Sequence, residues 1–364
     1  MKIHRPQPAS LSSPDLSAKV TEAKSTPAPF NPVVALFPDF KNNGVVVKPG
    51  TENTQAFSMT ALRASISTPA SATWSGYLTF IEGANQWMEI ASVRAERLSE
   101  QLGVPLVVIH NASFVREHAG ENWLRKQLHR LEEGLSNILL NQDIAQAESA
   151  KNVGKAMFDA LESKTPTYFA GESQGSILVG HGLRYAKEAF VEKHSQPAPG
   201  QPFDNPALAA QRRRQAEELF EERAGETLNI LTFGNAYAHY PDGPNYVHVS
   251  MHGDPVPNNG TRPDNHPEDA KTHYVIFDQL FPGKNNFENH NIAFLMELLH
   301  RTFELNDIPR GDLQAFFETA GKGELRAIAR PDQVDWPDDM EKQTWDSKSD
   351  VKASLATYRA AHPS

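Results

Sequence analysis

The sequence predicts an α/β protein whose mostly parallel sheet has helices on both faces. From about residue 72, short apolar runs of strand length alternate with segments whose apolar residues recur at helical spacing. The chain has 364 residues, of which 39% are hydrophobic, so it can bury a large core. No apolar run approaches the roughly 20 residues that a membrane-spanning helix needs, so we expect no transmembrane segment.

The N-terminal segment has the composition of a disordered leader. Residues 1 to about 33 are rich in Ser, Pro, Ala and Lys and lack a sustained apolar period, so burial cannot offset the entropy lost on ordering. Two apolar patches follow, at 33–37 and 45–47, and Pro38 and Gly44 lie between them. We expect a hairpin or a pair of edge strands there.

The remaining elements are expected within a central domain of residues 34–325. Strands are predicted at 77–81, 104–109, 167–170, 228–233, 246–252 and 274–277. Helices are predicted at 87–102, 113–147, 149–164, 177–190, 206–223 and 291–304, of which 206–223 lies in an insertion of about 194–226. Residues 326–364 are acidic and contain proline, and we expect them to form a surface tail.

Composition excludes several classes of function. The formal net charge of -10 is spread along the chain, which argues against nucleic-acid binding. Three arginines at 212–214 precede four glutamates, as in an exposed, ion-paired helix. The absence of cysteine excludes disulfides, thiolate catalysis and cysteine-ligated metals, and no cofactor is predicted. Lys2 and Arg5 precede no apolar h-region, so we expect a cytoplasmic protein or one exported without a Sec signal peptide.

A glycine-flanked serine is the strongest candidate for chemistry. Gly171-Glu172-Ser173-Gln174-Gly175 lies between an apolar strand and an amphipathic helix, the strand–turn–helix setting of a nucleophile elbow. The turn is so sharp that a side chain two residues from the serine would collide with neighbouring backbone. We predict Ser173 as the nucleophile; the alternative is a glycine-rich loop that only turns the chain.

A serine nucleophile needs a base and an acid that orients it, and both have candidates downstream. Asp254 follows the strand 246–252 and fits the acid, although an Asp before Pro255 can also simply begin a turn. His290 stands before the helix 291–304 and fits the base. His273, at the start of a strand, and His266, in a loop, remain alternatives.

The oxyanion that forms during acyl transfer also needs backbone donors. The expected groups are the N–H of the residue after the nucleophile and one from the loop after an early strand. These positions are Gln174, and Gly83 or Ala84.

Together these motifs resemble bacterial α/β-hydrolases of the lipase/esterase kind over about residues 75–305. The turn Gly-Asp-Pro-Val-Pro at 253–257 resembles the acid turn of the fungal-type (class 3) lipases. The resemblance implies a Ser173–His290–Asp254 triad that cleaves small-molecule or lipid esters or thioesters. Two departures count against long-chain lipids: Glu172 stands where many lipases carry His, and the loop at 83–85 lacks consecutive glycines. The Ser/Pro-rich leader resembles the export leaders of bacterial type III effectors.

Two other classes of function fit parts of the sequence. His248, His252 and Asp254 alternate along one face of a strand, with Asp264, His266 and Asp269 beyond it, and such a set could hold zinc in a metal-dependent hydrolase. Alternatively, the chain is a non-enzymatic interaction protein that keeps a hydrolase scaffold.

Overall fold

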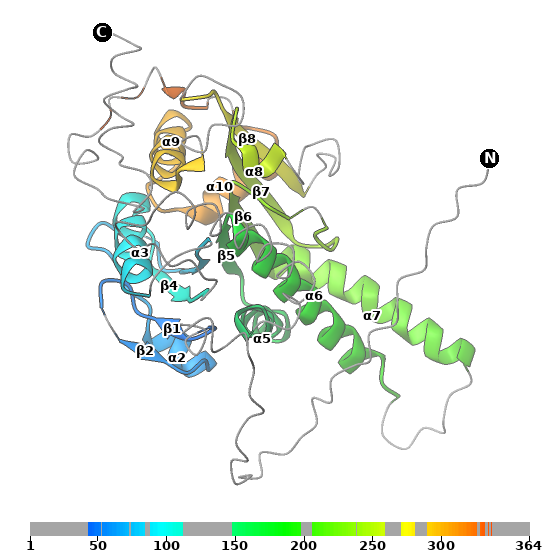
Figure 1. Ribbon diagram of the computed structural model, residues 1–364. Helices are drawn as coiled ribbons and strands as arrows, with labels where there is room; N and C mark the ends of the chain where they lie inside the picture. The colour runs from blue at the N-terminus through cyan, green and yellow to red at the C-terminus, as the bar shows by residue number, and fades with distance from the viewer. Residues whose placement is uncertain are drawn as a thin grey trace, which may run out of the picture. The chain divides into compact units, whose positions relative to one another are not determined.

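An eight-stranded sheet forms the centre of the computed structural model (Figure 1). The structure describes residues 43–51, 53–72, 74–83, 88–111, 148–197, 206–237, 239–258, 271–280, 290–325, 328–331, 334 and 336. All of them belong to the compact unit Asp39–Ser364. The predictions of a leader at 1–33, a strand at 33–37 and a helix at 113–147 lie outside the described residues.

The sheet is parallel except at one side. Its strand order is β2-β1-β4-β3-β5-β6-β7-β8; β3 to β8 run parallel, while β1 pairs antiparallel with both β2 and β4. The predicted α/β class with a mostly parallel sheet is therefore confirmed. The strands are β1 (Val46–Val47), β2 (Thr54–Gln55), β3 (Leu78–Ile81), β4 (Leu106–Ile109), β5 (Thr167–Glu172), β6 (Leu228–Phe233), β7 (Asn245–Met251) and β8 (Thr272–Phe277).

Helices follow most of the parallel strands, although β7 comes after β6 with no helix among the described residues between them. Gly103 ends the first long helix in a left-handed conformation, with φ +70°, and Asn291 caps the start of the last predicted one through a side-chain bond to the Ala293 N–H. The helices are α2 (Met59–Ala64), α3 (Met88–Leu102), α5 (Glu148–Ser163), α6 (Gln174–Ser195), α7 (Pro206–Thr227), α8 (Pro255–Asn258), α9 (Ile292–Leu305) and α10 (Leu313–Gly321).

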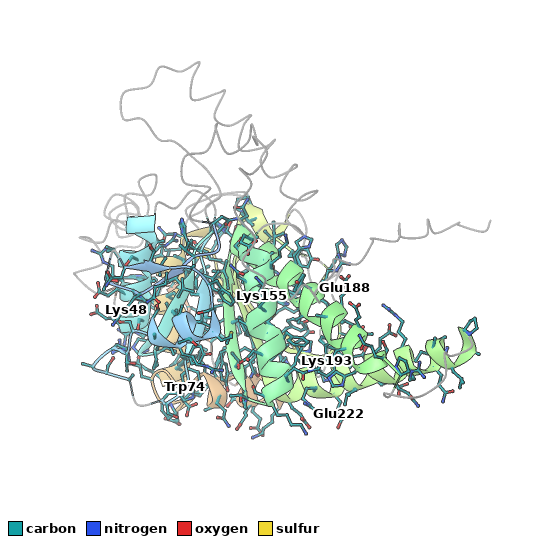
Figure 2. The ribbon with its side chains drawn as sticks, turned by 90° about the horizontal axis from the view of Figure 1, so that it is seen from below. Lys48, Trp74, Lys155, Glu188, Lys193 and Glu222 are labelled. Atoms are coloured by element: carbon teal, nitrogen blue, oxygen red, sulfur yellow. The ribbon has the colours of Figure 1, made fainter. Side chains whose placement is uncertain are left out.

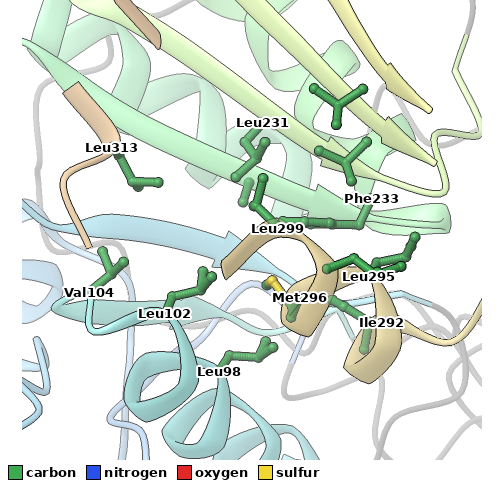
Figure 3. Packing of buried hydrophobic residues seen from close by; sticks show 14 of the residues in the cluster. Leu98, Leu102, Val104, Leu231, Phe233, Ile292, Leu295, Met296, Leu299 and Leu313 are labelled. Atoms are coloured by element: carbon green, nitrogen blue, oxygen red, sulfur yellow. The ribbon is translucent and has the colours of Figure 1, made fainter. Parts of the chain in front are cut away.

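Two hydrophobic cores lie on opposite faces of the sheet, because successive strand residues point to opposite sides. On β4, for example, Leu106 and Val108 join one core, whereas Val107 and Ile109 join the other. The first core lies under α3, α9 and α10, and the second lies under α5, α6 and α7 (Figure 1). Figure 3 shows part of the first core, where leucines of α3 and α9 lie in one cluster with Leu231 and Phe233 of β6.

Several parts of the fold differ from the sequence prediction, among them helix α2, which was not predicted. One of the two strands that pair with β1 is β2, a polar and exposed pair of residues that was not predicted. Helix α10 was also missed, although Asp312 caps it by accepting from the Ala315 N–H. The expected surface tail is partly wrong, because Ala329, Val334 and Trp336 are buried in the first core.

The outer faces of α5, α6 and α7 carry charges. Lys155, Glu188, Lys193 and Glu222, labelled in Figure 2, are all exposed on these helices. Helix α7 packs Ala216, Phe220 and Ala224 into the second core beside α6, and its last residue directly precedes β6. Over the described ranges, no helix combines the length and apolarity needed to cross a membrane.

Candidate active site

The candidate site lies at the edge of the sheet where the parallel strands end. In α/β proteins this edge is the usual place for ligands, because the loops that follow neighbouring strands meet there. Ser173 follows β5, Gly234 follows β6, and Asp254 comes shortly after β7. Residues from three separate parts of the chain are thereby brought to one edge.

Ser173 sits in a strained turn between β5 and α6. Its backbone has φ 50° and ψ -120°, values that a residue with a side chain rarely adopts. The serine precedes the first residue of α6, yet its side chain makes no hydrogen bond that caps this helix. The hydroxyl is therefore available for other chemistry. Ser173 N–H donates to the carbonyl of Phe233, which holds the turn against the end of β6, at 2.9 Å.

The flanking glycines are required by contact, as the sequence predicted. A Cβ atom on Gly171 would lie within 3.0 Å of the backbone of Ser176. One on Gly175 would lie within 3.0 Å of the carbonyl oxygens of Ile81 and Glu82. Real Cβ atoms essentially never approach backbone this closely, so any side chain at either position would force the turn apart.

Asp254 and His290 form a buried hydrogen-bonded pair. Asp254 Oδ2 accepts from His290 Nδ1 at 2.8 Å, and Asp254 is only 1% exposed. The other oxygen, Oδ1, accepts from the N–H of Val256 at 2.9 Å. Asp254 therefore does begin the turn before Pro255, and it binds the histidine as well.

The second ring nitrogen of His290, Nε2, lies on the side of the ring away from the bond to Asp254. With Nδ1–H donated to Asp254, the neutral ring carries its acceptor lone pair on Nε2. This atom is buried and has no hydrogen-bond partner among the described residues, Ser173 included. Hydrogen bonds between catalytic groups are often long in unliganded enzymes. A Cβ on Gly234 would lie within 3.0 Å of the His290 ring, so His290 and Ser173 both adjoin the end of β6 at residues 233–234.

The electrostatics around His290 favour its protonated form. Burial alone would lower the pKa of the imidazole, but the charge and hydrogen bond of Asp254, and then the charge of Glu172, outweigh burial. Arg94 acts in the opposite direction to these carboxylates. The net result is that the pKa of His290 is raised above its ordinary value.

We expect Asp254→Asn to lower the pKa of His290, since the variant removes the largest influence that raises it. The pKa of His290 is higher in the folded protein than its unfolded value of about 6.5. The Asp254–His290 pair therefore contributes its full stabilisation at pH values below the unfolded pKa. This contribution is lost as the pH rises through the folded pKa. NMR titration of the imidazole, assigned by comparison with His290→Gln, measures the midpoint, and denaturation at several pH values measures stability. An unchanged midpoint would contradict this assignment.

The expected oxyanion donors are only partly placed. Gln174 is the first residue of α6, where backbone N–H groups have no partner within the helix. Gly83 lies beside Ser173: a Cβ on Gly83 would be 3.1 Å from Ser173 Cβ. Its N–H donates to Glu172 Oε2 at 3.4 Å. Ala84 lies outside the described residues, so the role of all three as donors stays a prediction.

The alternative histidines lie elsewhere. His273 is the second residue of β8 and pairs in register with Val247 of β7, four residues before β7 ends. It therefore lies toward the amino end of the sheet, away from Ser173. His266 lies outside the described residues.

The alternative metal ligands do not gather in the described part. His248 is buried and contacts Thr232 Oγ1 through Nδ1 at 2.8 Å, while His252 is exposed. No group of three or more His, Cys, Asp or Glu residues able to hold a metal ion occurs among the described residues. Asp264, His266 and Asp269 lie outside them.

Two buried polar groups beside Ser173 were missed from the sequence. One is the ion pair of Glu172 with Arg94, whose signal was a charged residue on the apolar stripe of the helix 87–102. The other joins the ends of β3 and β4 to α6: Glu82 pairs with His110, and Asn111 Nδ2 bonds the carbonyls of Glu82 and Gly83 and the side chain of Gln174. Polar residues placed directly after buried strands could have indicated this second group.

Comparison with known proteins brings no family assignment. No protein-family model matches the chain, and no curated protein matches it.

Proposed function

We propose that this chain is a serine hydrolase of the α/β-hydrolase type, which cleaves an ester or thioester through Ser173, His290 and Asp254. The observation that carries the proposal is the strained backbone of Ser173, φ 50°, at a strand–helix junction that adjoins the Asp254–His290 pair. Strain of this kind at a non-glycine residue persists where function requires it. It lifts the side chain out of the regular hydrogen bonding of strand and helix.

The order of the elements supports the same type of fold. In α/β-hydrolases the nucleophile follows a central strand, and the acid and then the histidine come later in the chain. Here Ser173 follows β5, which lies in the middle of the sheet between β3 and β6, and Asp254 and His290 come later in that order.

The proposed reaction proceeds in two transfers. His290 Nε2 takes the proton of Ser173 as Oγ attacks the carbonyl carbon, and backbone N–H groups stabilise the resulting oxyanion. Collapse breaks the bond to the alcohol or thiol, which leaves with the proton from His290. Water, deprotonated by the same nitrogen, then attacks the acyl carbon; the bond to Ser173 Oγ breaks, His290 returns the proton to Oγ, and the acid is released. Asp254 holds the tautomer of His290 throughout.

Activity-based labelling tests this proposal. A fluorophosphonate probe should react with wild type, and peptide mass mapping should place the label on Ser173. Ser195→Ala is a matched control, since this serine ends α6 about 30 Å from Ser173, and its hydroxyl donates to the carbonyl of Glu192. This variant should label like wild type. A series of p-nitrophenyl esters of increasing chain length then measures the acyl preference.

The same experiment separates the competing functions. A folded wild type that neither labels nor turns over any ester would favour a non-enzymatic interaction protein. Ester turnover that a chelator abolishes, without labelling of Ser173, would favour the metal-dependent hydrolase. Chelator-resistant turnover that falls together with labelling supports the serine mechanism.

A further inference from the structure

A buried ion pair adjoins the nucleophile. Arg94, on α3, donates from Nη2 to Glu172 Oε1 at 2.5 Å, and their side chains are only 6% and 7% exposed. Glu172 is the last residue of β5 and directly precedes Ser173. Its second oxygen, Oε2, accepts from the N–H of Gly83. The carboxylate therefore links α3, the nucleophile turn and the segment after β3.

Stability alone is a weak reason for this pair. Removing two charges from water costs several kcal/mol per ion, and well-packed apolar residues often replace such pairs with no loss of stability. The guanidinium is not fully satisfied either, because Arg94 Nε is buried and has no hydrogen-bond partner among the described residues. Position offers the better explanation, since the pair lies where a hydrolase must hold its backbone donors and its base.

We propose that Glu172 and Arg94 are positioning residues, which together fix the Gly83 peptide against the nucleophile turn and balance the charge that acts on His290. This inference rests on the proposed hydrolase function. In this proposal neither Glu172 nor Arg94 contacts the substrate.

The positioning part of the proposal follows from contacts on both sides of Gly83. Glu172 accepts the Gly83 N–H, and Asn111 Nδ2 donates to the Gly83 carbonyl at 3.3 Å. Gly83 is thus held through both its N–H and its carbonyl. It lies close to Ser173, because a Cβ on Gly83 would be 3.1 Å from Ser173 Cβ. Orientation of the peptides that follow β3 decides where their donors point. Misplacing such donors by about 1 Å can cost about 100-fold in rate.

The charge-balancing part follows from the opposite signs of the two residues. The charged groups that act on His290 are Asp254, Glu172 and Arg94, from the turn after β7, from β5 and from α3. Glu172 raises the pKa of His290 and Arg94 lowers it, so the two members of the buried ion pair act on the imidazole in opposite directions. Loss of one member exposes the charge of the other.

Single charge-removing variants test this balance. Glu172→Gln keeps an acceptor for the Gly83 N–H but removes the negative charge, so the midpoint of His290 should fall. Arg94→Gln should raise the midpoint of His290. Two readouts apply: the NMR titration of His290, and the second-order rate of fluorophosphonate labelling as a function of pH. Arg213→Gln, which removes an exposed charge on α7, should move neither readout.

Each single variant leaves one buried charge without its partner and can therefore fail to fold. A double variant avoids this problem. Glu172→Met with Arg94→Met buries no unpaired charge and should fold at least as well as wild type. Its labelling rate should nevertheless fall about 10-fold or more, because Gly83 loses its acceptor. A folded double variant that labels at the wild-type rate would overturn the positioning role.

The outcomes distinguish this inference from the proposed function. Wild type that never reacts with the probe would overturn the hydrolase and the inference that rests on it. Wild type that reacts, with both single variants folded and their midpoints unmoved or moved in the same direction, would overturn the charge balance alone. Opposite shifts with a slow double variant support both parts.

Discussion

Replacing Ser173 with alanine should abolish fluorophosphonate labelling and lower ester turnover by about 1,000-fold or more. The reason is the loss of the attacking oxygen, since alanine keeps the Cβ and the backbone of the turn. Because the hydroxyl does not cap α6, the melting temperature should stay close to that of wild type. Turnover of p-nitrophenyl esters and thermal unfolding measure the two effects. A fully active Ser173→Ala variant would refute the assignment of the nucleophile.

Ser173→Gly provides a sharper version of the same experiment. Both variants remove the hydroxyl, but only glycine adopts φ 50° and ψ -120° without steric cost. Strain of this kind costs about 1–3 kcal/mol. Ser173→Gly should therefore be inactive and yet more stable than Ser173→Ala by an amount in this range, measured by chemical denaturation. Equal stabilities would mean that the turn stores no strain.

Replacing Gly234 with alanine should lower activity by about 100-fold or more, although residue 234 has no reactive group. The new methyl would lie within 3.0 Å of the His290 ring and 3.1 Å from Asp254 Oδ2. The ring must move to admit it, so Nε2 leaves its position and the bond to Asp254 is disturbed. Turnover and the NMR midpoint of His290 should both change.

Gly323→Ala is the matched control for this variant. Gly323 has φ +66°, close to the φ +54° of Gly234, but a Cβ there would meet nothing within 4 Å. Both variants should lose about 1–2 kcal/mol of stability from the left-handed backbone. Only Gly234→Ala should lose activity. Wild-type turnover in Gly234→Ala would show that the His290 position is not critical.

Periodic parts of the fold could be predicted from the sequence. The strand 228–233 agrees with β6 at both ends, and the helix predicted at 291–304 differs from α9 by one residue at each end. Both segments combine apolar periodicity with a clear boundary, such as Asn291 at the start of α9. Thr54–Gln55 is polar and two residues long, so no period marks β2. Isolated apolar residues such as Trp336 likewise carry no signal of the core into which they pack.

The residues of the candidate site also differ in how far the sequence alone indicates them. Ser173 has a local motif, and Asp254 and His290 follow from its known order along the chain. The bond between the last two, 36 residues apart, needed the fold, as did the ion pair of Arg94 with Glu172, 78 residues apart. Contacts between residues so far apart in the sequence produce no pattern in the local periodicity. A charge on an apolar helical stripe indicates burial, but it does not indicate the partner.

The brevity of β2 protects one border of the sheet. An open border with a long row of unpaired backbone groups invites another chain to add its own strand, which leads to aggregation. Beyond β4, the described part of the sheet ends in the two-residue strand β1 and then in the two exposed residues of β2. An incoming strand would find too few consecutive donors and acceptors to extend the ladder, so intermolecular strand addition is disfavoured there.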